Sequence, residues 1–158
     1  MVDIGDTAPT FTAPLVGDET EPFSLSNVLG TDPLVLAFFP AAFSTTCTAE
    51  LCTFRDEISR FGELGASVFG ISTDLPYALA RFRDENDLPF GLISDNDGAI
   101  IAAYDVVDNW EHIALPAVAQ RAVFVIDTEG QIGYAWRANN PSHEPEYDAV
   151  AEAVSRLW

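Results

Sequence analysis

The sequence is organised around the stretch FFPAAFSTTCTAELCTFRD, residues 38–56, which contains both cysteines of the chain. The run Leu34 to Phe39 that leads into it is apolar throughout and is typical of a buried strand. A loop is expected from Pro40 to Thr46, and a helix is expected to begin at about Thr46. These expectations place Cys47 in the first turn of that helix.

The spacing of apolar residues supports this helix. They recur at intervals of three and four, which lines one helix face: Leu51, Phe54, Ile58 and Phe61. Cys47 falls on the same face, where the positive end of the helix dipole and the unpaired amides of the first turn favour thiolate over thiol. Since the thiolate is the nucleophilic form, Cys47 is the candidate nucleophile. The alternative is an inert core thiol, because free cysteine is among the most buried residue types.

The residues that precede Cys47 form a pattern. The pattern is a proline, three residues, a threonine or serine, two residues and a cysteine, and it is formed here by Pro40, Ser44 and Cys47. In this pattern the sequence resembles the peroxiredoxins of the AhpC/TSA superfamily. Glu50 stands where that family also carries a glutamate. Serine at position 44 departs from the usual threonine, but its hydroxyl can donate and accept a hydrogen bond in the same way.

The resemblance covers nearly the whole chain. It begins at Gly5-Asp6-Thr7-Ala8-Pro9, and the later stretch RAVFVID, residues 121–127, is similar to the family's second signature. Within the family the sequence is most similar to AhpE-like and PrxQ/BCP-like members. The resemblance implies a thioredoxin-like α/β fold, in which helices flank a central mixed β-sheet, with an N-terminal β-hairpin.

The order of the expected elements agrees with this fold. Strands are expected at residues 11–16 and 22–25, which form the hairpin, and at 34–39, 67–72, 92–93, 122–126 and 131–136. Helices are expected at residues 46–64, 76–86, 99–104 and 145–157. Residues 73–76 are expected to cap the second helix, with Pro76 in its first turn. Residues 105–120 show no periodicity and are expected to be a loop that borders the active site.

The resemblance also implies a function and a set of site residues. The function is a thiol-dependent peroxidase that reduces hydrogen peroxide and small organic hydroperoxides through a cysteine sulfenic acid, without metal, haem or flavin. Ser44 and the backbone amides around Cys47 would hold the peroxide, and Pro40 would shield the thiolate. Arg121 would supply a fixed positive charge, and Glu50 would orient an arginine.

Taken singly, three of these residues also fit ordinary structural roles. Glu50 alone fits a first-turn acid that the helix dipole favours. Arg121 alone fits a charge exposed at a strand end, and Pro40 alone fits a strand terminator. Their joint spacing is what supports the active-site interpretation.

The second cysteine raises a geometric question. Along a helix, Cys47 and Cys52 would have Cα atoms about 9 Å apart and turned about 140° from each other, whereas a disulfide tolerates at most about 7 Å. The spacing resembles that of PrxQ-like proteins, which implies that Cys52 is the resolving cysteine. In that case the first turn or two of the helix must unwind before the disulfide forms. The alternative is that Cys52 is a bystander and that an external thiol resolves Cys47.

The composition limits the possible domain organisation and binding partners of the protein. The chain has 158 residues and is 48% hydrophobic, which suits a single domain, residues 1–158. There are 25 acidic residues against 7 basic ones, and every basic residue is arginine. Such a surface repels nucleic acid and anionic membranes. Because the acidic residues are scattered, we interpret them as an adaptation to a salt-rich cytoplasm, the alternative being an acidic docking face for a basic partner.

The expected location follows from the sequence itself, and the expected partners follow from the resemblance. No apolar stretch reaches the length of a membrane span, and the N-terminus lacks a signal pattern, so the cytoplasm is the expected location. The resemblance implies a thioredoxin- or glutaredoxin-like reductant. AhpE-like relatives suggest a homodimer, whereas PrxQ-like ones are often monomers.

Three other classes of function make different demands on the sequence. A dithiol-disulfide oxidoreductase needs cysteines two residues apart. A copper chaperone of the thioredoxin fold needs closely spaced cysteines and a positioned histidine. A redox-inert scaffold would not react with peroxide. Residues 95–98, Asp-Asn-Asp-Gly, fit a turn better than a calcium loop. His112 and His143 are isolated and offer no metal site. The tryptophans are interpreted as packing residues: Trp110, Trp136 and Trp158.

Overall fold

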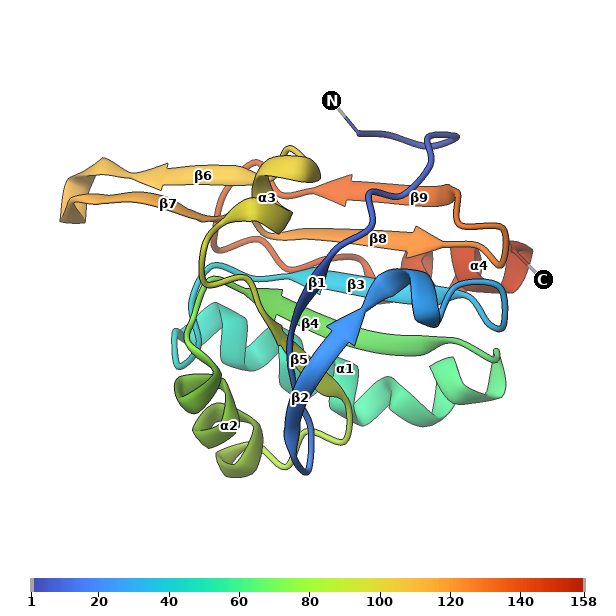
Figure 1. The fold of residues 1–158 in the computed structure, drawn as a ribbon, viewed down its shortest axis with the longest axis horizontal. Coiled ribbons are helices and arrows are strands. Elements are labelled where there is room, and N and C mark those ends of the chain that lie inside the picture. Colours follow the sequence, from blue (N-terminus) through green and yellow to red (C-terminus); the bar gives the residue numbers. More distant parts are fainter. Residues whose placement is uncertain (1, 158) are drawn as a thin grey trace.

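A mixed seven-stranded sheet forms the centre of the computed structural model, which describes residues 2–157 (Figure 1). Its strands are β1 Thr12–Val16, β2 Thr20–Ser24, β3 Leu34–Phe38, β4 Ser67–Ser72, β5 Gly91–Ser94, β8 Ala122–Ile126 and β9 Ile132–Arg137. They lie in the order β2-β1-β5-β4-β3-β8-β9. β3, β4 and β5 are parallel, whereas β1 and β8 pair antiparallel with their neighbours. The thioredoxin-like mixed sheet and the N-terminal hairpin of β1 and β2 are thus confirmed.

Helices cover both faces of the sheet. On one face lie α1 Thr45–Glu63, α2 Pro76–Glu85 and α4 Tyr147–Arg156, whose apolar side chains share one buried cluster with the strands. On the other face lie α3 Ala99–Ala103 and the short 3-10 helix Leu25–Asn27, which contribute to a second cluster. In Figure 1, α3 is in front of the sheet and α1 is behind it.

Strand β3 explains why there are two cores. Its side chains alternate, so that Val35 and Ala37 join the cluster under α1, α2 and α4, whereas Leu34, Leu36 and Phe38 join the cluster under α3. All five residues are buried. A strand that is buried on both faces requires a continuous apolar run, and this is why the run was recognisable in the sequence.

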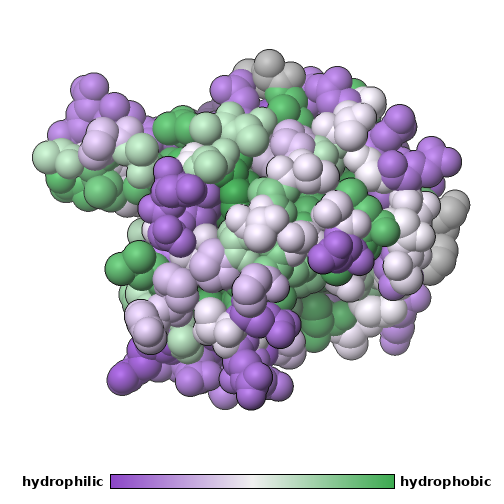
Figure 2. Space-filling view, in the orientation of Figure 1, coloured by the Kyte–Doolittle hydropathy of each residue, from purple (hydrophilic) through white to green (hydrophobic). Residues whose placement is uncertain are grey.

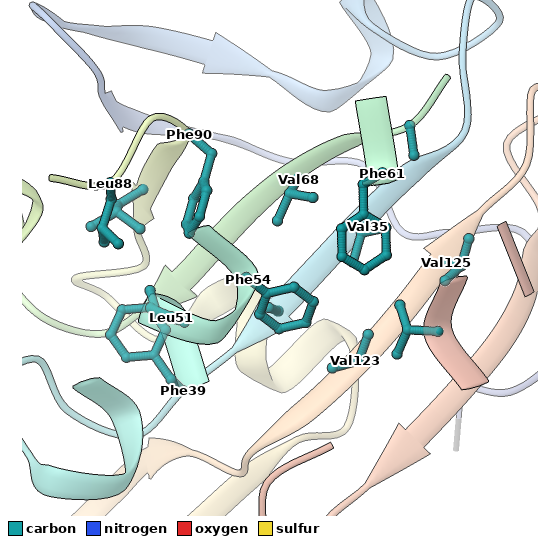
Figure 3. Packing of buried hydrophobic residues seen from close by; sticks show 14 of the residues in the cluster. Val35, Phe39, Leu51, Phe54, Phe61, Val68, Leu88, Phe90, Val123 and Val125 are labelled. Carbon is teal, nitrogen blue, oxygen red and sulfur yellow. The ribbon is translucent and has the colours of Figure 1, made fainter. Parts of the chain in front are cut away.

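Phe54 provides a test of the core beneath α1. Its ring is fully buried and lies among side chains from the sheet (Figure 3). It makes aromatic contacts with Phe61 and Tyr147, at centroid distances of 5.7 and 5.2 Å. We expect Phe54→Ala to lower the free energy of unfolding by about 3–5 kcal/mol, because it removes buried apolar surface and leaves a cavity. Urea denaturation measures this change. Tyr77→Ala is the control, because Tyr77 is 90% exposed, and equal losses in both variants would contradict this packing.

The segment expected to be a loop, residues 105–120, is instead a projecting hairpin, so that expectation was wrong. It consists of β6 Val107–Trp110, the 3-10 helix Glu111–Ile113 and β7 Leu115–Ala119 (Figure 1). The alternating pattern that marks a strand is missing because most of the hairpin is solvent-exposed on both faces. The pairing shifts register between Asp108 and Trp110, and Pro116 within β7 weakens the strand signal further.

The other boundaries differ from expectation by at most two residues, and 67–72 and 122–126 agree residue for residue. Residues 95–98 form a turn: both oxygens of the Asp95 carboxylate accept amide hydrogen bonds from Ile100 and Ile101 at the start of α3.

Trp136 packs against the core, but Trp110 lies on the projecting hairpin, half-buried, with its ring near that of His112. Trp158 lies outside the described residues.

The surface carries the excess of acidic residues. Figure 2 shows hydrophilic groups around the rim of one face and hydrophobic groups on the hairpin that projects to the left. Its exposed large hydrophobic residues are Val107, Ile113 and Leu115. Among residues 2–157, no helix combines the length and apolarity needed to cross a membrane.

Salt is expected to stabilise the protein at neutral pH. The chain carries a formal net charge of −18, and its self-repulsion is screened as the Debye length falls from about 10 Å at 0.1 M salt to about 3 Å at 1 M. The thermal unfolding midpoint should therefore rise with chloride concentration at pH 7. The rise should largely disappear near the sequence pI of about 4.1. A midpoint that falls with salt at pH 7 would contradict this account.

Candidate active site

Cys47 lies in the first turn of α1, as predicted. Ser44 is the N-cap residue, and its carbonyl oxygen accepts hydrogen bonds from the amide and the hydroxyl of Thr48, at 2.9 and 2.8 Å. The Ser44 hydroxyl makes no capping hydrogen bond to the helix. The Cys47 side chain is fully buried. The start of the helix therefore presents the thiol beneath the surface, next to a half-buried serine.

Sheet pairing brings Arg121 to this thiol from the other half of the chain. In the antiparallel pairing of β3 with β8, Phe38 faces Ala122. The residues after β3 therefore meet the residue before β8, which is Arg121. Its guanidinium Nη2 lies 3.2 Å from the Cys47 Sγ, and its Nη1 donates to the Glu50 Oε1 at 2.8 Å. Because Arg121 is only 2% exposed, the interpretation as an exposed strand-end charge is wrong.

A backbone carbonyl completes the environment of Arg121. The Pro141 oxygen accepts hydrogen bonds from the arginine Nε, at 3.0 Å, and from its Nη2, at 2.8 Å. The loop that carries Pro141 is anchored at Ala138, whose amide donates to the Arg121 carbonyl oxygen at 2.9 Å. The role of Pro141 has no signal in the sequence, because any residue can supply a carbonyl oxygen. The three contacts hold the guanidinium fork in one orientation beside the sulfur.

Glu50 is buried with a hydrogen-bond partner for only one of its two carboxyl oxygens. Its side chain has no exposed surface, and its Oε2 has no hydrogen-bond partner in the part of the chain described. Burial raises the pKa of this carboxyl to about 7, although the charge and hydrogen bond of Arg121 act in the opposite direction. Glu50 also lies beyond the first turn of α1, which contains no acidic residue. The interpretation as a first-turn acid is therefore wrong.

The raised pKa of Glu50 predicts a pH dependence of stability. A carboxyl whose pKa is higher in the folded state favours folding when it is protonated, so its contribution is present below the unfolded value of 4.5 and is lost as pH rises through about 7. We therefore expect wild type to lose about 2–3 kcal/mol relative to Glu50→Gln between these limits. Urea denaturation of both proteins at each pH measures the difference. A difference independent of pH would contradict the shift.

The loop between β3 and α1 is fixed by contacts that the sequence did not reveal. The Ala42 amide donates to the Asp74 Oδ2 at 2.9 Å, and the same oxygen accepts from the Ser72 hydroxyl at 2.7 Å. The N-cap of α2 is Leu75, within the stretch 73–76 expected to cap it, and Pro76 occupies the first turn as expected, but no side chain of the stretch provides a capping hydrogen bond. Asp74 instead anchors the loop in front of Cys47.

Two further residues of this loop have distinct environments. Pro40, directly after Phe39, is buried. Phe43 has a φ of 69°, a left-handed conformation that is rare for a bulky residue, and its ring packs edge-on against Phe82 at 5.2 Å between centroids. Strained conformations of this kind persist where the surrounding structure over-determines them, which is frequent at functional sites.

Cys52 lies away from this cluster. Both cysteines are free, and α1 is continuous from Thr45 to Glu63. The Cys52 Sγ lies 3.6 Å from the Asn86 Oδ1, at the end of α2. The structure thus brings Cys47, Glu50 and Arg121 together and leaves Cys52 on another face of the helix. Among residues 2–157, no three His, Cys, Asp or Glu side chains gather in a way that could hold a metal ion.

A cysteine at a helix start beside a buried arginine, on a thioredoxin-like sheet, defines a thiol-based oxidoreductase. The family model described as AhpC/TSA family matches residues 4–135. The chain therefore belongs to the AhpC/TSA family and is a peroxiredoxin, a thiol-dependent peroxidase.

Individual relatives agree with this assignment along the full chain. A Coxiella burnetii relative, bcp, is 36% identical over 158 residues, which is 99% of each protein. Peroxiredoxin Bcp of Bacillus subtilis is 33% identical and covers 99% of this chain and 95% of its own. The crystal structure of peroxidoxin BcpB from Mycobacterium tuberculosis superposes with a TM-score of 0.86 at 30% identity, covering 100% of this chain and 99% of that one.

Proposed function

We propose that Cys47 is the peroxidatic residue, which reduces hydrogen peroxide and small organic hydroperoxides. Its thiolate attacks one peroxide oxygen, so that an S–O bond forms and the O–O bond breaks. The other oxygen leaves with the electron pair, takes up a proton and departs as water or an alcohol. Cys47 is thereby oxidised to the sulfenic acid. The observation that carries this proposal is the 3.2 Å contact between the Cys47 Sγ and the buried Arg121 guanidinium.

The surrounding residues have complementary roles in this proposal. The positive charge of Arg121 stabilises the thiolate and the charge that develops on the leaving oxygen, because it is held in place before the reaction begins. Glu50 orients that arginine. Ser44, with the amides of Thr46 and Cys47, holds the peroxide, and Pro40 shields the sulfur. The full burial of Cys47 favours small peroxides, because covering side chains must move before a substrate reaches it.

Cys52 acts in the second half of the cycle. Its thiolate attacks the sulfur of the Cys47 sulfenic acid, an S–S bond forms, the S–O bond breaks, and the oxygen leaves as water after protonation. The continuous α1 helix must first unwind locally, because helical geometry holds the two cysteines about 9 Å apart. A thioredoxin- or glutaredoxin-like protein then reduces the disulfide. The second candidate is resolution of Cys47 by an external thiol, which the contact of Cys52 with α2 favours.

The protein would work as a single domain in a cytoplasm of high salt content. Its acidic surface and the two free cysteines support this setting.

Intact mass and free-thiol counting, before and after one equivalent of hydrogen peroxide at high salt, test the proposal. Loss of both thiols with a mass change of two hydrogens is the expected result. Gain of one oxygen with one thiol left would keep Cys47 in its role but assign resolution to an external thiol. No change within seconds would overturn the proposal.

A further inference from the structure

The end of α2 forms a contact with Cys52 that the peroxidase chemistry at Cys47 does not use. The Cys52 Sγ lies 3.6 Å from the Asn86 Oδ1, within the range of a thiol hydrogen bond. Asn86 is the C-cap residue of α2, and its Nδ2 donates to the Phe82 carbonyl oxygen at 2.9 Å. The Asn86 side chain therefore connects the second cysteine to the end of another helix.

A second contact joins the same two helices at the same residue. The Arg55 Nη1 donates to the Asn86 carbonyl oxygen at 2.7 Å. Arg55 lies one turn beyond Cys52 on α1, so the segment of α1 around Cys52 is attached to α2 through both the backbone and the side chain of Asn86. Both Cys52 and Asn86 are half-buried, which limits competition from water.

These contacts oppose the movement that disulfide formation requires. For Cys52 to reach Cys47, the helix between them must unwind, and the Cys52 thiol must leave Asn86. We propose that Asn86 is a positioning residue that holds Cys52 in the folded helix and thereby sets the rate of disulfide formation after Cys47 has been oxidised. The inference rests on the proposed function, because it assumes that Cys52 resolves the Cys47 sulfenic acid.

The rate of this step decides the fate of the sulfenic acid. A sulfenic acid that has not yet formed the disulfide can react with a second peroxide molecule. One peroxide oxygen is transferred to the sulfur, which gives the sulfinic acid, and the rest of the peroxide leaves as water or an alcohol. A strong hold on Cys52 therefore favours the sulfinic acid at high peroxide, and a weak hold favours the disulfide.

Two substitutions separate the contact with the thiol from the cap of α2. Asn86→Ala removes both the acceptor for the Cys52 thiol and the donor to Phe82. Asn86→Asp keeps an acceptor oxygen for the thiol but cannot donate to the Phe82 carbonyl. Rapid mixing with peroxide, followed by acid quench and mass analysis, gives the rate of disulfide formation and the sulfinic fraction. The rate of the first oxidation in the same samples is the internal reference, and Asn96→Ala, in an exposed turn, is the matched control.

Asn86→Ala is expected to form the disulfide about three- to ten-fold faster than wild type, the range that loss of one hydrogen bond allows, and to yield less sulfinic acid. Asn86→Asp and Asn96→Ala should show no acceleration. Equal rates for Asn86→Ala and wild type, or equal acceleration in both Asn86 variants, would overturn the inference. If Asn86→Ala fails to fold, Asn86→Ser, whose side chain is shorter, takes its place.

The failure of the proposed function has a different signature. If the first oxidation occurs but wild type forms no disulfide between Cys47 and Cys52, both the inference and the resolving role of Cys52 are overturned, while the peroxidatic role of Cys47 stands. If the first oxidation does not occur, the proposed function itself fails. Alkylation of Cys52 in the reduced protein is independent of peroxide, and it should be faster in Asn86→Ala than in Asn86→Asp.

Discussion

Cys47→Ser is expected to abolish peroxide reduction, leaving no more than the rate of buffer and reductant alone. A serine hydroxyl does not ionise at neutral pH and cannot pass through a sulfenic acid, so the nucleophile and the oxidised intermediate are lost together. The measurement is peroxide consumption with dithiothreitol as reductant. The fold should persist, because serine is nearly the size of cysteine and its hydroxyl can accept the hydrogen bond that Arg121 donates to the sulfur.

Cys52→Ser is the matched control for this loss. It removes the other cysteine, which lies away from Arg121 on the face of α1 that meets Asn86. Its first oxidation by peroxide should proceed at nearly the wild-type rate, and an external thiol can then complete the cycle. A Cys47→Ser protein that retained activity, or a Cys52→Ser protein that lost the first oxidation, would reverse the assignment of the two cysteines.

Arg121→Met should produce the second large effect, a fall of about 10²–10³-fold in the second-order rate constant for Cys47 oxidation. This is the usual cost of removing one fixed donor from the place where charge develops. Arg121→Lys should fall between wild type and Arg121→Met, because it keeps a positive charge but loses the planar fork that contacts Cys47 and Glu50 together. Rapid mixing with hydrogen peroxide measures the three rate constants.

Loss of stability must be separated from loss of rate in this series. Without Arg121, the buried Glu50 carboxyl loses the charge and the hydrogen bond that oppose its raised pKa, and the loss of one partner of a buried pair costs up to about 3–5 kcal/mol. The double variant Glu50→Gln with Arg121→Met should recover much of that stability but not the rate. If it recovered the rate as well, Arg121 would act only by supporting the fold.

Local patterns were sufficient to predict much of this structure. The apolar run of β3 and the three-and-four spacing of α1 are properties of neighbouring residues, and both elements form as predicted. The position of Cys47 in the first turn follows from them. The fold as a whole and the grouping of Arg121 with Cys47 came from the resemblance to peroxiredoxins. No local signal states that β8 pairs with β3, and that pairing is what delivers Arg121 to the sulfur.

The features that were predicted wrongly or not at all share a physical cause. The interactions that determine them are not visible in the pattern of neighbouring side chains. The hairpin β6–β7 is held by backbone hydrogen bonds and is largely exposed, so its strands have no apolar alternation to recognise. Pro141 contributes a carbonyl oxygen that any residue would carry. Asp74 has the local context of a helix cap, but its carboxylate bonds to the Ala42 amide, 32 positions away in sequence.

Trapping of the sulfenic acid in the two single-cysteine proteins tests the central claim most directly. Reduced Cys52→Ser and Cys47→Ser are each mixed with one equivalent of hydrogen peroxide in the presence of dimedone, which forms a stable adduct with sulfenic acids. The masses of their peptides are then measured. The account predicts an adduct on Cys47 in Cys52→Ser within seconds, and no adduct on Cys52 in Cys47→Ser on that timescale. An adduct on Cys52, with Cys47 unmodified in the companion protein, would contradict it.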